Sequence, residues 1–134
     1  MSGAAVVRHI LANNATLNAA IPPERITAGV APIGTELPAI SITQVSGVSP
    51  FDPVDAPGNM IRERVQVTVE AKKYAQVKSI MSMVRSAFTT YSRGTVNGIA
   101  CDSVMQDNDG PDLMDPDTEI YSQSTDFIVR WISL

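Results

Sequence analysis

Few residues of this chain could carry out chemistry, and their types and spacing form no catalytic set. His9 is the only histidine, and no nucleophile or acid lies at a suitable spacing from it. A general base must reach its partner through a hydrogen bond, so we expect a surface histidine without a catalytic role. Cys101 is the only cysteine and has no histidine neighbour, which favours a buried, inert thiol over a nucleophile.

The acidic segment 107–117 is the one stretch whose composition suggests a metal loop. An EF-hand places ligands at its first, third and fifth positions, glycine at the sixth and glutamate at the twelfth. With Gly110 at the sixth position, Asp107 and Asp109 fit, but Met105 occupies the first position and a proline occupies the twelfth. The match fails at both anchors, so we expect an acidic, turn-rich loop.

Other signatures of chemistry are also missing from the sequence. It contains no glycine-rich phosphate loop, no zinc-ligand spacing and no Ser/His/Asp set. The sequence therefore predicts a protein that is not an enzyme, with no catalytic residue, no cofactor and no metal.

Length and charge set wider limits. A chain of 134 residues can form its own core, and we expect a single domain over 1–134. Its 10 basic and 14 acidic residues give a net charge of −4, which argues against general affinity for nucleic acid phosphates. We find no secretory signal, and no apolar run reaches the roughly 20 residues that span a bilayer. A soluble protein made in a cytosol, with no membrane contact, is expected.

Apolar periodicity predicts two helices. The first covers 3–13, with Val6, Val7, Ile10 and Leu11 at helical spacing, and a short apolar turn follows it. The second covers 74–91, and apolar side chains recur along it at steps of three and four. Its apolar stripe consists of Val77, Ile80, Met81, Val84, Phe88 and Tyr91.

Alternating and apolar runs predict strands. The clearest is 62–71, where Val65, Val67 and Val69 alternate with polar residues, so one face should be buried and the other wet. Further strands are expected at 25–31, 39–45, 95–105 and 120–134. The order of elements predicts an α+β fold, a mostly antiparallel sheet of four to five strands with two helices packed on one face.

Two long connections complete the expected domain, a loop at 47–60 and the acidic loop at 107–117. The Gly47–Gly58 part of the first loop holds three prolines and two glycines, and it is about twice the usual connection length. Phe51 and Val54 lie in it without a periodic element to bury them. An aromatic side chain seated in a partner's pocket can supply much of a binding energy, so we expect this loop at an interface.

Several stretches together carry a resemblance to a known family. The first is an opening helix at 7–11 that leads into 17–26, and the second is Leu37–Pro38 with the strand 39–42 after it. The third is the central strand 64–71, followed by Tyr74 and the helix through 84–87. The fourth is the closing strand 125–132. In this order they resemble the phage tail terminator, or tail completion, family of long-tailed phages. The resemblance covers nearly the whole chain. It consists of an order of elements with their apolar positions, without a catalytic fingerprint.

The resemblance implies a structural virion protein in the tail or neck, assembled in the cytoplasm of a bacterial host. Its subunits would form a ring, commonly six-fold, that caps the tail tube at its head-proximal end. The implied partners are other copies of the chain, the major tail tube protein and the head connector or head-completion protein. DNA would pass through the ring without sequence-specific binding. Two alternatives stay open: another head–tail joining or tail-tube subunit, and a small cytosolic ligand-binding α+β domain.

Eight residues are candidates for a subunit or partner interface. Arg62 and Arg64 are two residues apart on one strand, so both project from the face opposite the helices. Two like charges there are poorly explained by a monomer, and we expect carboxylates of a neighbouring subunit, from 107–117, to pair with them. Ile128 lies in a strand that is apolar on both faces and needs cover on both. The full set is Phe51, Val54, Met60, Arg62, Arg64, Asp107, Asp109 and Ile128.

Overall fold

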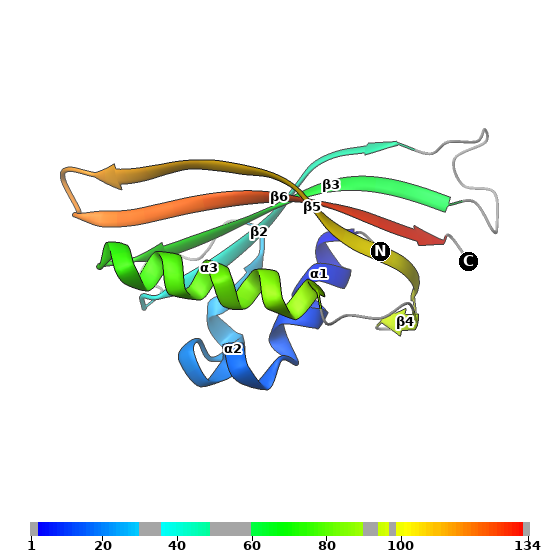
Figure 1. The fold of residues 1–134 in the computed structure, drawn as a ribbon, viewed down its shortest axis with the longest axis horizontal. Helices are drawn as coiled ribbons and strands as arrows, with labels where there is room; N and C mark the ends of the chain where they lie inside the picture. Colours follow the sequence, from blue (N-terminus) through cyan, green and yellow to red (C-terminus); the bar gives the residue numbers. More distant parts are fainter. Residues whose placement is uncertain (1–2, 30–35, 49–59, 90–93, 97–98, 133–134) are drawn as a thin grey trace.

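The computed structural model has three helices on one face of a twisted sheet (Figure 1). It describes residues 3–29, 36–48, 60–89, 94–96 and 99–132. The helices are α1 (Gly3–Ala12), α2 (Ala15–Ala20) and α3 (Tyr74–Thr89), and Pro23–Arg25 forms one 3₁₀ turn. None of the described helices is long and apolar enough to cross a membrane.

The described residues form a sheet of six strands in the order β1-β2-β3-β6-β5-β4. The first two strands are parallel and every other pair is antiparallel. The strands are β1 (Ile26–Ala28), β2 (Ala39–Val48), β3 (Met60–Ala71), β4 (Gly94–Val96), β5 (Ile99–Asp115) and β6 (Ile120–Ile132). The α+β class and the mostly antiparallel sheet are thus confirmed.

The predicted numbers of helices and strands were too low. Residues 95–105 were expected to form one strand, but the described residues of this segment belong to two, β4 and β5. The apolar turn after the first helix is the separate helix α2, because Asn14 accepts a hydrogen bond of 2.9 Å from the backbone N–H of Leu17. A side chain that caps a helix in this way satisfies one of the N–H groups that the first turn leaves free.

The hydrophobic core lies between the sheet and the helices. Val65, Val67 and Val69 of β3 are all fully buried on the helix side, which confirms the alternation that the sequence showed. Phe88 of α3 packs on Phe127 of β6 with ring centroids 4.7 Å apart. The stripe of α3 is buried at Val77, Ile80, Met81, Val84, Ala87 and Phe88. Tyr91, which was expected to extend it, lies outside the described residues.

The acidic loop predicted at 107–117 is mostly a strand. Pairing with β6 continues to Asp115, and four residues, 116–119, form the turn. The register shifts between Asp109 and Asp112, so Gly110 and Pro111 form an irregularity in the ladder. Proline is tolerated at bulges because it needs no ladder hydrogen bond there. Glycine fits because a Cβ at position 110 would lie 2.9 Å from the carbonyl oxygen of Ser124, which is too close for any other residue.

Candidate assembly surface

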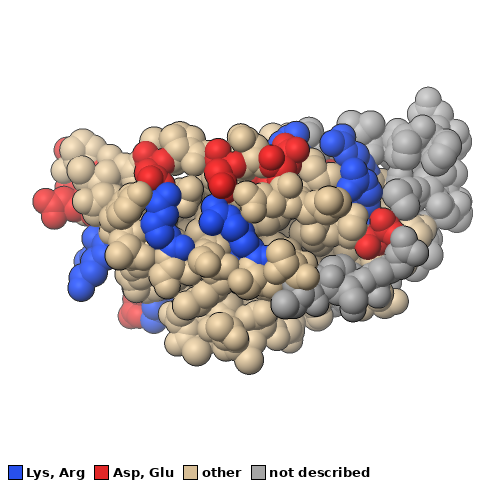
Figure 2. Space-filling view, in the orientation of Figure 1, with Lys and Arg blue, Asp and Glu red and all other residues tan. Residues whose placement is uncertain are grey.

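The acidic half of β5 forms ion pairs with α3. An Asp109 oxygen lies 2.7 Å from Nη2 of Arg85, and an Asp112 oxygen lies 2.6 Å from Nζ of Lys78. Lys78 and Arg85 are seven residues apart, about two helical turns, so they lie on the same side of the helix. Figure 2 shows acidic and basic side chains side by side along this side of the molecule. The carboxylates therefore join the strand to the helix instead of lying free in solvent.

Hydrogen bonding shifts the pKa of both carboxylates in the same direction. The bond from Arg85 is the largest cause that lowers the pKa of Asp109, and the hydroxyl of Thr125 adds a second bond of 2.9 Å. The pKa of Asp112 is lowered first by the bond from Lys78 and then by the bond from the Tyr74 hydroxyl. A hydrogen bond to the charged form favours that form. Both aspartates are therefore held ionised below their ordinary titration range.

Arg64 lies on the face opposite the helices, as predicted, but its partners belong to the same chain. Its Nη1 donates to Asp107 of β5 and, at 3.3 Å, to Asp126 of β6. The hydrogen bond to Asp107 is the largest cause that raises the pKa of Arg64. The expectation that a neighbour's carboxylates pair with Arg64 is corrected, because β5 brings Asp107 beside it within one subunit.

A different arginine lies opposite Arg62. In the β3–β6 register, Arg62 is the direct partner of Arg130. Arg62 is exposed and Arg130 is half-buried, with Nη1 of Arg130 3.8 Å from the sulfur of Met105. Within the described part of the chain, neither guanidinium forms an ion pair. The sequence did not reveal this pair, because it depends on the register between two strands far apart in the chain.

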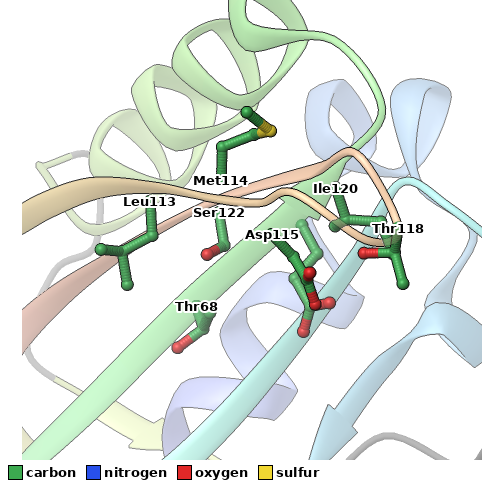
Figure 3. Close-up of a pocket in the computed structure, with 8 residues that line it drawn as sticks. Thr68, Leu113, Met114, Asp115, Thr118, Ile120 and Ser122 are labelled. Carbon is green, nitrogen blue, oxygen red and sulfur yellow. The ribbon is translucent and has the colours of Figure 1, made fainter.

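The other end of the same face is hollowed. A depression of about 550 Å³ is lined by residues of β3, β5, β6 and the turn between the last two. Figure 3 shows Thr68, Leu113 and Ser122 directed to one side of the sheet and Met114 to the opposite side. Two carboxylates line the depression, and no described cation pairs with either. The lining residues are Thr68, Glu70, Leu113, Met114, Asp115, Thr118, Ile120 and Ser122.

The other predicted interface residues have different positions. Phe51 and Val54 lie outside the described residues. Met60 begins β3 opposite Ile132. Ile128 is only 6% exposed within the subunit, so a partner cannot reach most of its side chain as the subunit stands.

Neither of the residues considered for chemistry is fully exposed. Cys101 is buried, and His9 is half-buried on α1. No three His, Cys, Asp or Glu side chains among the described residues form a group that could hold a metal ion. The features that call for explanation are the uncovered sheet face and its charges.

A family model covers the chain from residue 4 to residue 131, and its description is "Tail completion protein gp17". The chain belongs to the tail completion protein gp17 family. It is therefore a tail protein of a virion, and the resemblance found in the sequence is confirmed. No curated protein matches the chain in sequence.

Solved structures agree with the tail completion fold. A chain in the structure entitled "Virion of native gene transfer agent (GTA) particle" superposes with a TM-score of 0.71. The two sequences are 14% identical, and the match covers 98% of this chain and 95% of that chain. At this identity the match supports the fold alone, including its long sheet and one-sided helices.

Proposed function

We propose that this tail completion protein is a structural subunit of a ring that caps the head-proximal end of the phage tail tube. The observation that carries the proposal is the family match over residues 4–131, which spans both the helical layer and the sheet. In this role the chain joins the finished tube to the head connector or head-completion protein. The family resemblance suggests that the ring contains six subunits.

The one-sided fold supports a subunit with neighbours. All three described helices lie on the same face of the sheet, and no described element covers the opposite face (Figure 1). That face carries Arg62 and Arg130 at one end and a hollow with Glu70 and Asp115 at the other. Two different patches on one chain suit heterologous contacts, which form a ring when the rotation closes.

The proposed role is one of assembly, without catalysis. Members of a tail completion family serve as structural parts of a particle, which supports a role in assembly. The net charge of −4 suits a passage through which DNA moves without being held, because phosphate affinity comes from lysine and arginine. We therefore expect no sequence-specific DNA binding.

Complementation tests the proposed role. A phage that lacks this gene should produce tails of irregular length or tails without heads, and the chain supplied in trans should restore headed particles. Normal particles in its absence would contradict the proposal. Tubes of indefinite length formed by the purified chain would instead favour a tail-tube subunit.

A further inference from the structure

The uncovered face of the sheet carries unpaired charges of opposite sign at its two ends. Arg62 and Arg130 are register partners near one end of β3 and β6. Glu70 and Asp115 line the hollow near the other end. None of these four side chains forms an ion pair with another described residue. One oxygen of Asp115 accepts a hydrogen bond of 2.9 Å from the backbone N–H of Asp117, which leaves its negative charge without a cation.

The described residues of one subunit do not explain the arginine pair. Like charges placed directly opposite each other on neighbouring strands are destabilising. The neighbouring Arg64 shows the arrangement that resolves such a charge, since Asp107 and Asp126 flank it. No described carboxylate plays this part for Arg62 or Arg130, and among the described residues the guanidinium of Arg130 donates to the sulfur of Met105.

The carboxylates of the hollow in the same subunit lie too far from the arginine pair. Arg62 and Glu70 are eight residues apart on β3, and at about 3.4 Å per residue the separation is roughly 27 Å. Ion pairs need atoms within about 4 Å. The two patches therefore cannot neutralise each other within one subunit.

Between subunits the two patches match in number and in character. Two guanidinium groups face outward at one end and two carboxylates at the other, and arginine binds carboxylate through paired hydrogen bonds. Each patch also has an exposed apolar side chain, Met105 at 58% exposure beside the arginines and Leu113 at 59% in the hollow. Burial of apolar surface beside complementary charge is typical of protein interfaces.

We propose that the hollow containing Glu70 and Asp115 on one subunit receives Arg62 and Arg130 of a second copy of this chain. The occupant is a second copy because this chain itself supplies both halves of the contact. In the proposed ring each subunit offers its arginine pair to one neighbour and its hollow to another, so the contact is heterologous and repeats from subunit to subunit. The inference rests on the proposed ring and assigns residues to its seam.

Charge reversal tests the contact in a phage that depends on this chain. Glu70→Arg with Asp115→Arg makes both patches basic, and Arg62→Glu with Arg130→Glu makes both patches acidic. Removing a buried, hydrogen-bonded charge partner weakens an interface on the order of 100-fold, so each double variant should reduce headed particles by at least about tenfold. The quadruple variant, with both patches exchanged, should regain most of the yield.

A matched control tests whether a change in net charge alone explains the loss of assembly. Lys72→Glu with Lys73→Glu changes the charge as much as the arginine reversal does, and both lysines are exposed in the turn before α3. This variant should assemble normally. Double reversals that assemble as the wild type does, or a folded quadruple variant that stays inactive, would overturn the proposed contact.

Cross-linking separates this inference from the proposed function. In a Cys101→Ser background, Arg62→Cys and Asp115→Cys place one thiol in each patch, and a short bis-maleimide is added to purified tails. A ladder of linked subunits supports the contact, whereas Asp115→Cys alone should give no ladder. If this chain is present at the tail end but gives no ladder of linked subunits, the proposed contact is wrong and the proposed ring cap is unaffected. Protein absent from the tail end overturns the ring cap itself.

Discussion

The carboxylate of Glu63 accepts a hydrogen bond of 2.6 Å from the backbone N–H of Gly3, on the buried face of β3. The first N–H groups of a helix have no partner within the helix, and negative charge is favourable beside them. Glu63 thus joins the beginning of α1 to the sheet. Gly3 permits the approach, since a Cβ there would lie 2.7 Å from the Glu63 oxygen.

Replacing Glu63 with alanine should therefore destabilise the fold. A buried donor left without its partner costs about 1–3 kcal/mol of the free energy of unfolding, measured by urea denaturation followed by circular dichroism. Glu70→Ala is the control, because Glu70 lies on the same strand but on the uncovered face, where changes are usually within about 0.5 kcal/mol. Equal losses in the two variants would show that the bond to Gly3 adds no stability.

Val67 tests the facing of the central strand. It is fully buried on the helix side of β3. Val67→Ala should cost about 2 kcal/mol, near the low end for buried aliphatic residues. Val67→Asp should cost far more, because it buries an unpaired charge. Thr68→Asp is the control, because Thr68 is the next residue along the strand and lies on the opposite face. The Thr68→Asp variant should have a much higher melting temperature than the Val67→Asp variant. A lower melting temperature for Thr68→Asp would mean that the strand faces the other way.

The ion pairs between β5 and α3 should make stability depend on pH. The pKa values of Asp109 and Asp112 are lowered in the folded state, so their contribution is present above the unfolded value near 3.9 and is lost as pH falls through the folded values. Asp109→Asn with Asp112→Asn should lower the melting temperature at pH 7, and the difference from wild type should shrink below about pH 3.9. Asp117→Asn is the control. A difference in melting temperature between the double variant and wild type that does not change with pH would contradict this account.

The acidic residues of β5 should not bind calcium specifically. Asp107, Asp109 and Asp112 already pair with cationic side chains of the same subunit. Calcium would have to displace those side chains and then find further oxygen ligands. Isothermal titration calorimetry with micromolar calcium should give no binding signal. A signal that disappears with Asp107→Asn and Asp109→Asn would refute the prediction.

The sequence was most informative where burial alone determines the pattern. The alternation around Val67 and the stripe through Val84 reflect a sheet face and a helix face that both meet the core, so residue spacing was enough to predict them. Alternation failed at Cys101 and Val104. It predicts opposite sides for them, yet both are buried because the register shifts between Cys101 and Ser103.

What the sequence could not show depends on partners that are distant in the chain. Gly110 and the prolines near it predicted a loop, but pairing with β6 and ion pairs with Lys78 and Arg85 hold the segment as a strand. The pairing of Arg64 with Asp107, and of Arg62 opposite Arg130, follows from register alone. For the same reason the hollow that contains Glu70 was not foreseen.

The central claim is that this tail completion protein forms a ring at the head-proximal end of the tail. The most direct measurement is electron cryomicroscopy of particles in which the chain carries a small fused tag on Leu134. The account predicts one ring of extra density between the tail tube and the head connector, and no such density along the tube. Tag density repeated along the tube, or located at the distal tip, would contradict it.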